Sequence, residues 1–136
     1  MILVALVIMI GMPSCTKPEK QIVGKWKIVY AKVDGYKDEY AVGHVWTFKD
    51  NGKFSGYLGL DDFEEEEFYC NWLIDEGELV FNGGDLENNS EGFEEIVLTL
   101  DIEQLDKENL VVSGKVRYKS GYSSGSYNVS YELERK

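Results

Sequence analysis

The stretch IVGKWKIVY, residues 22–30, contains the clearest structural signal of the chain. If this stretch is extended, alternate residues share a face, with Ile22, Gly24, Trp26, Ile28 and Tyr30 on one side and Lys25 and Lys27 on the other. Such alternation with a period of two predicts a β-strand that buries one face. A glycine two residues before a tryptophan indicates a bend, or the close approach of another segment, where the strand begins.

The same alternation continues along the rest of the chain. Further strands are predicted at residues 45–49, 53–59, 67–74, 78–81, 96–102, 110–118 and 127–133. Turns at Asp50-Asn51-Gly52 and Asp75-Glu76-Gly77 supply residues that tolerate a positive φ between consecutive strands. About eight strands with mostly short connections favour an all-β, antiparallel up-and-down barrel. A two-sheet sandwich is the alternative, but its crossovers require longer connections.

Length and charge narrow the class of protein. The 136 residues suffice for one domain. Acidic residues outnumber basic ones 25 to 14, which gives a formal net charge of −11. Nucleic-acid binding requires a basic surface, so a nucleic-acid partner is not expected, and neither is electrostatic docking to anionic lipid. The charge is typical of a protein kept soluble by self-repulsion.

The first fifteen residues, MILVALVIMIGMPSC, differ from the rest. Their apolar run is shorter than the roughly 20 residues of a membrane-spanning helix and fits a secretion signal. Met12-Pro13-Ser14-Cys15 resembles a bacterial lipobox. The resemblance implies a signal peptide at 1–14, a lipidated Cys15 with a tether at 15–21, and a domain at 22–136. It also implies a location in the bacterial cell envelope, with the outer membrane favoured over the inner. An uncleaved anchor and an ordinary secreted protein are the alternatives.

Gly24-Lys25-Trp26 resembles the Gly-x-Trp signature of lipocalins and related calycin barrels. With the second motif, WTFKDNG at 46–52, the chain resembles the lipocalin-like domains of Bacteroidota envelope lipoproteins. The resemblance implies that Gly24 and Trp26 close one end of the barrel and that Arg135 lies across the tryptophan. The alternative for Arg135 is that it is simply a charged residue in a frayed C-terminus, without contact to the tryptophan. Most members of this group have no assigned activity, so the resemblance implies a fold and a location rather than a ligand.

Candidate groups for catalysis are few. The chain has a single histidine, His44, and a single cysteine other than Cys15, which is Cys70. These two residues are too few for a catalytic triad or a metal cluster. We therefore expect no catalytic residue, no metal site, no cofactor and no enzyme activity. Cys70 is predicted to be a buried hydrophobe and His44 a half-buried residue at a strand end. The acidic run at 61–67 is expected to be a solvated loop, although clustered carboxylates can also hold Ca²⁺ or contact a basic partner.

The interior raises the main functional question. Bulky inward residues can fill a small barrel completely or line an apolar pocket. The candidates for such a pocket are Trp46, Phe48, Phe54, Phe68, Trp72 and Tyr131. The first hypothesis is a lipid-anchored, non-enzymatic lipocalin-like protein that binds a small apolar ligand in the barrel. The alternative is a protein-interaction or inhibitor module, with a filled barrel and contacts through the acidic loops and the Tyr/Ser/Gly-rich loop at 119–127.

Overall fold

A computed structural model describes residues 17–58, 68–86, 95–119 and 124–136. The predicted signal peptide, Cys15 and the acidic run at 61–67 lie outside these residues. Nine strands are described: β2 (Gly24–Val33), β3 (Tyr36–Lys37), β4 (Val45–Phe48), β5 (Lys53–Gly56), β6 (Phe68–Asp75), β7 (Glu78–Asn82), β8 (Glu95–Leu105), β9 (Asn109–Lys119) and β10 (Ser124–Arg135). Two short helical segments accompany them, α1 (Pro18–Gln21) and the 3₁₀ turn η3 (Gly84–Leu86).

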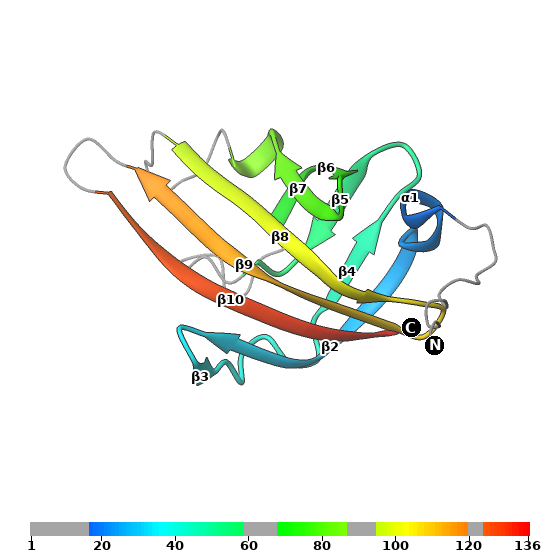
Figure 1. Ribbon diagram of the computed structural model, residues 1–136, viewed down its shortest axis with the longest axis horizontal. Helices are drawn as coiled ribbons and strands as arrows, with labels where there is room; N and C mark the ends of the chain where they lie inside the picture. The colour runs from blue at the N-terminus through cyan, green and yellow to red at the C-terminus, as the bar shows by residue number, and fades with distance from the viewer. Residues whose placement is uncertain (1–16, 59–67, 87–94, 120–123) are drawn as a thin grey trace, which may run out of the picture.

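The strands close into a barrel (Figure 1). From β4 to β10 each strand pairs antiparallel with the next one in the chain, and β10 returns to pair with β2. The two-residue β3 pairs with the far end of β2 and extends one edge of the barrel as a hairpin. The remaining eight of the nine strands therefore form the closed antiparallel barrel that the hydrophobic alternation predicted.

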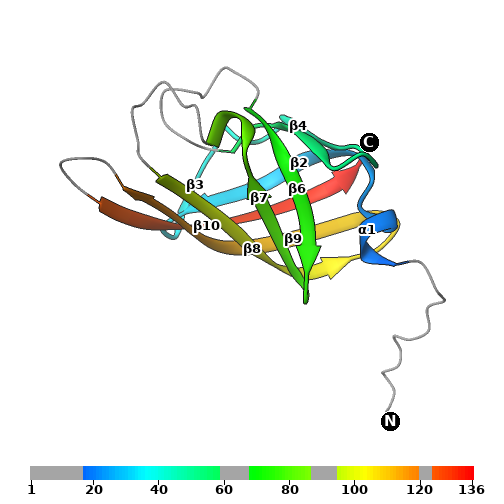
Figure 2. The ribbon, with the colours of Figure 1, turned by 90° about the horizontal axis from the view of Figure 1, so that it is seen from above.

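The pairing defines two ends of the barrel, both visible in Figure 2. At one end, called here the closed end, β2 begins, β10 ends, and tight turns join β4 to β5, β6 to β7 and β8 to β9. The turn after β6 uses Glu76 and Gly77, whose φ values are 51° and 83°. At the other end, called the open end, β2 connects to β4 through residues 34–44, and β10 begins. Helix α1, within the predicted tether, lies at the closed end (Figure 2).

The predicted facing of the first strand is wrong at Tyr30. The register of β10 against β2 shifts by one residue, because Glu132 pairs with Tyr30 while Leu133 pairs with Ile28. Val29 is thus an extra residue, a β-bulge, and it reverses the facing of the strand beyond it. Ala31 becomes buried, and Tyr30 turns to the outer face. A bulge of this kind cannot be recognised from a strict period of two.

The described part of the barrel interior is apolar. Among the described residues, no buried side chain is polar or charged. Phe68, Cys70 and Tyr131, which the sequence predicted to be inward or buried, are each at most 4% exposed, and Val112 and Val129 are buried beside them. In the described part of the chain, no helix is long and apolar enough to cross a membrane.

Candidate functional site

The closed end is sealed by Arg135. Its guanidinium carbon lies 4.0 Å from the centroid of the Trp26 ring. The same group donates hydrogen bonds to three backbone carbonyls: Nη1 to Val23 at 2.8 Å, Nη2 to Gln21 at 2.7 Å and Nε to Lys107 at 3.1 Å. Partial burial lowers the pKa of Arg135 from its usual value. One side chain therefore ties together the start of β2, the end of α1 and the β8–β9 turn.

Gly24 makes this arrangement sterically allowed. Its φ of +131° lies where side chains are rarely tolerated, and a Cβ there would lie 2.8 Å from Nη1 of Arg135. Two residues on, the buried Trp26 donates its indole Nε1–H to the carbonyl of Ile22 at 2.8 Å. The glycine before the tryptophan thus serves a bend and a close approach together, and the arginine is the group that approaches.

A cluster of aromatic side chains, called here the aromatic floor, fills the barrel above this seal. Its members are Trp46, Phe48, Phe54, Trp72, Phe81 and Tyr131. Trp46 lies at its centre, with ring centroids 5.0 Å from Tyr131, 5.6 Å from Phe54 and 6.1 Å from both Phe48 and Phe81, all in edge-to-face geometry. Edge-to-face pairs at these separations are attractive beyond their buried area. The floor is therefore a packed layer.

The small inward residue Gly56 does not open a space beside Trp46. A Cβ on Gly56 would lie 2.6 Å from Cδ1 of Trp46, so the indole occupies the room that the glycine provides. Trp46 also donates its Nε1–H to the carbonyl of Tyr57 at 2.6 Å, and the Tyr131 hydroxyl donates to the carbonyl of Leu58 at 3.4 Å. Burial raises the pKa of Tyr131 well above its usual value. The segment after β5 is thus tied to the floor.

The mouth of the barrel is the part of the interior nearest the open end, on the wall formed by β8, β9 and β10. Ile96 and Leu98 on β8 face inward opposite Tyr118 and Val116 on β9, and Tyr127 on β10 pairs with Val116. Ile96, Leu98 and Val116 are buried, whereas both tyrosines are half-buried. The two tyrosine rings lie 6.4 Å apart. This combination is an apolar wall with two phenol groups at its rim.

Five of the six pocket candidates from the sequence come together in the aromatic floor. Phe68, the sixth, is buried at the start of β6. Phe81 belongs to the floor as well, although it was not among the six. The candidates at the mouth, Tyr118 and Tyr127, were missed, because sequence reasoning ranked residues by bulk rather than by distance from the closed end. Their inward parity on β9 and β10 was the available signal.

Residues with reactive side chains take structural roles. Cys70 is 4% exposed and is a free thiol, and burial together with nearby Asp85 raises its pKa to about 12. His44 is half-buried and stacks on Tyr57 with ring centroids 4.6 Å apart. Among the described residues, no group of three or more His, Cys, Asp or Glu side chains is placed to hold a metal ion.

An eight-stranded antiparallel barrel with a Gly-x-Trp first strand and an arginine across the tryptophan defines a lipocalin type of barrel. The family described as "Lipocalin-like domain" matches residues 22–112. The chain therefore belongs to the lipocalin-like domain family.

The structural comparison matches solved structures from Bacteroides. A lipocalin-like protein from Bacteroides uniformis ATCC 8492 is 18% identical with a TM-score of 0.50, over 85% of this chain and 99% of that chain. An uncharacterized protein from Bacteroides eggerthii DSM 20697 is 16% identical with a TM-score of 0.49, over 84% of this chain and 98% of that chain. No curated protein matches the chain. At such identities the likeness to the first structure supports the fold alone.

Proposed function

We propose that this chain is a non-enzymatic binding protein of the bacterial cell envelope that takes a small apolar ligand at the mouth of its barrel. One observation carries the proposal: the inner wall of β8–β10 is apolar, and near the open end it carries the half-buried Tyr118 and Tyr127 above an aromatic floor. Ligand sites in proteins are typically apolar surfaces with a few polar groups that orient the ligand. The two phenol groups would serve that purpose here.

The floor limits where the ligand lies. The six floor side chains are at most 8% exposed and pack on one another, so a ligand would rest on top of this layer. It would contact one face of each mouth tyrosine, because Tyr118 and Tyr127 are the half-buried side chains of this wall, whereas Val116 and Leu98 beneath them are fully buried. The packed floor predicts a short ligand rather than a long chain that reaches the closed end.

Anchoring through lipid on Cys15, in the outer rather than the inner membrane, is part of the same proposal. Helix α1 begins at Pro18, and Gln21 at its end is held to the closed end by Arg135. Two residues separate Cys15 from Pro18, a connection that spans at most about 10 Å when extended. An anchored barrel would therefore hold its closed end at the membrane surface and turn its mouth away from the lipid.

A fluorescence titration tests the proposed site. A naturally fluorescent fatty acid is added to the domain, and energy transfer from the tryptophans is followed, with Trp46 in the floor as the nearest expected donor. We expect saturable transfer at one ligand per chain. The double variant Y118A/Y127A should weaken binding about tenfold or more, because it removes both aromatic contacts at the mouth.

The matched control exchanges the same residue types outside the barrel. Tyr36 and Tyr40 are 79% and 63% exposed on the connection between β2 and β4. The variant Y36A/Y40A should leave affinity within about twofold. Equal losses in both double variants, or no saturable transfer in the parent chain, would contradict the proposed site.

A second candidate function, a protein-interaction module, is favoured by a different observation. Tyr36, Tyr40 and Val42 expose 79%, 63% and 43% of their surfaces within one connection at the open end. Exposed tyrosines of this kind are common in protein interfaces. The variant Y36A/Y40A separates the two functions, because only the second predicts that binding of an envelope partner is lost while fatty-acid binding persists.

A further inference from the structure

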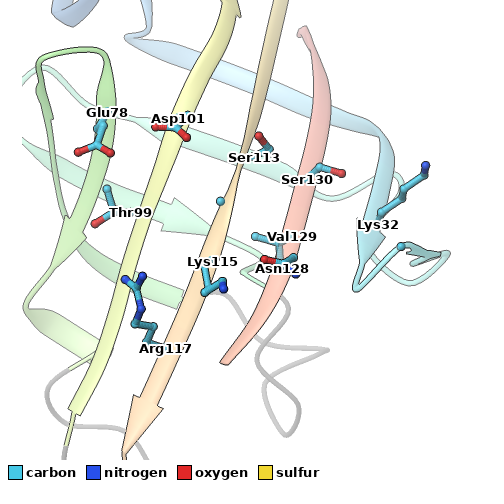
Figure 3. Close-up of a pocket in the computed structure, with 12 residues that line it drawn as sticks. Lys32, Glu78, Thr99, Asp101, Ser113, Lys115, Arg117, Asn128, Val129 and Ser130 are labelled. Atoms are coloured by element: carbon cyan, nitrogen blue, oxygen red, sulfur yellow. The ribbon is translucent and has the colours of Figure 1, made fainter. Parts of the chain in front are cut away.

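A polar groove with a volume of about 740 Å³ crosses the outer face of the barrel, over β7, β8, β9, β10 and β2 (Figure 3). Its side chains alternate with those of the interior. On β9, for example, Lys115 and Arg117 line the groove and are exposed, whereas Val116 between them is buried. The groove is therefore separate from the mouth, and the two surfaces are available to different ligands.

The register of the sheet aligns one row of polar side chains across the groove. Glu78 pairs with Asp101, Asp101 with Ser113, Ser113 with Ser130, and Ser130 with Lys32, so five strands each contribute one residue. Neighbouring strands lie about 4.8 Å apart, which gives the row a length of about 19 Å. The row passes from carboxylates through two hydroxyls to an ammonium group. The Ser113 hydroxyl donates to Glu103, so it can only accept a hydrogen bond from a ligand, whereas Ser130 and Lys32 can donate.

A second row brings more positive charge into the groove. Thr99, Lys115 and Asn128 are paired across β8, β9 and β10, and Arg117 follows on the same face of β9. Figure 3 shows Lys115 and Arg117 following one another along β9. Within the described ranges, neither Lys115 nor Arg117 forms an ion pair with a carboxylate. Two unpaired cations are a specific local feature on a chain whose net charge is −11.

The chemistry of the groove selects a class of ligand. Hydroxyl, amide and carboxylate groups recognise a ligand rich in hydroxyls, because a hydroxyl both donates and accepts hydrogen bonds. The cations recognise acidic groups, and the guanidinium of Arg117 can bind a carboxylate through two hydrogen bonds. A peptide adding as a further strand is disfavoured here, because β7 to β10 and β2 each have paired neighbours on both sides.

From these observations we propose that the outer groove binds a linear oligosaccharide that carries carboxylate groups. Its sugar units lie across the strands, their hydroxyls bonded to the row from Asp101 to Ser130. The carboxylates lie against Lys115 and Arg117. Lys32, whose Nζ lies 5.8 Å from the centroid of the Tyr30 ring, contacts the end of the ligand over β2.

Calorimetric titration of the full chain at low ionic strength tests this site with three defined probes. The first is a linear oligouronide of four units, the second a neutral oligosaccharide of the same length, and the third an oligoglutamate of the same charge. We expect saturable binding of the oligouronide, with both other probes about tenfold weaker or more. Equal binding of the neutral sugar would overturn the role of the cations, and equal binding of oligoglutamate would overturn the recognition of sugar.

Matched variants locate the binding. K115Q/R117Q removes two charges from the groove and should weaken oligouronide binding about tenfold. K25Q/K27Q removes two exposed charges from β2 near the closed end and should change it less than about twofold. Neither pair is buried, so both variants are expected to fold, which circular dichroism checks. No saturable binding by the parent chain, or equal losses in both variants, would overturn the proposal.

Discussion

The closed end and the mouth of this barrel are built from similar apolar strands but differ in what holds them. At the closed end, one arginine satisfies three carbonyls and covers Trp26, and a glycine makes room for it. At the mouth, Tyr118 and Tyr127 are half-buried at the rim of an apolar wall. The comparison distinguishes the part of the fold that hydrogen bonds hold fixed from the part where we propose that a ligand binds.

The aromatic floor divides the two regions, and its loss should have the largest effect on stability. Trp46→Ala removes a buried side chain with four edge-to-face neighbours and a hydrogen bond to Tyr57. We expect the free energy of unfolding to fall by about 3–5 kcal/mol. Denaturant unfolding measures it, with Tyr36→Ala at an exposed position as the control, expected to cost less than about 0.5 kcal/mol. Similar costs for both would mean that the floor is not packed.

At the closed end, we expect the largest loss of stability from a substitution at Gly24. Gly24→Ala places a methyl group against Arg135 at a strained φ of +131°. Gly35→Ala is the matched control, because its φ is +86° but nothing lies within 4 Å of the added Cβ. Gly24→Ala should cost about 1–3 kcal/mol more than the control in denaturant unfolding. Equal costs would show that backbone strain alone, without the arginine, explains the glycine.

Arg135 itself should have a smaller but measurable effect. Arg135→Gln removes the contact with Trp26 and hydrogen bonds to the carbonyls of Gln21 and Val23. We expect a loss of about 1–2 kcal/mol and a red shift of tryptophan emission as Trp26 becomes hydrated. Arg117→Gln, on the outer face, should change stability by less than about 0.5 kcal/mol. An unchanged melting temperature in Arg135→Gln would contradict the sealing role.

The smallest expected effect on the free energy of unfolding comes from the ionisation of Cys70, and this effect appears only in alkaline solution. Burial raises the pKa of the Cys70 thiol from its usual value of 9.0 to about 12 in the folded chain, because it disfavours the thiolate. The unfolded chain therefore loses the thiol proton first, so this stability is present below pH 9 and is lost as the pH rises toward 12. Between pH 9 and 10 the contribution should fall by about 1 kcal/mol. In Cys70→Val this part of the pH dependence should be absent. Identical pH profiles of the free energy of unfolding for the parent chain and Cys70→Val would contradict the raised pKa of the thiol.

The closed end could be predicted from sequence because its signals are local. Gly24 and Trp26 are two residues apart, whereas the position of Arg135 across the tryptophan was expected only from the resemblance to lipocalins. The facing of Tyr30 could not be predicted in this way, because the bulge at Val29 depends on how β10 pairs with β2. The same holds for Gly56, because only the fold shows that Trp46 occupies the space beside this glycine.

The two proposed binding surfaces were harder to predict, because each depends on register between distant strands. Asp101 and Ser113 appear in the sequence as ordinary solvent-facing residues. Their alignment with Ser130 and Lys32 follows from pairing across four strands, which no local pattern contains. Likewise, Tyr118 and Tyr127 stand at the mouth because β9 and β10 extend far toward the open end.

The most direct test of the central claim, that the mouth above the aromatic floor is the ligand site, is an NMR titration of the isotopically labelled domain with a short fatty acid. We predict saturable amide shifts that centre on Val116, Tyr118 and Tyr127 and leave Trp26 and Arg135 unchanged. Shifts that centre on the closed end or the outer groove, or no shifts at millimolar fatty acid, would contradict the claim.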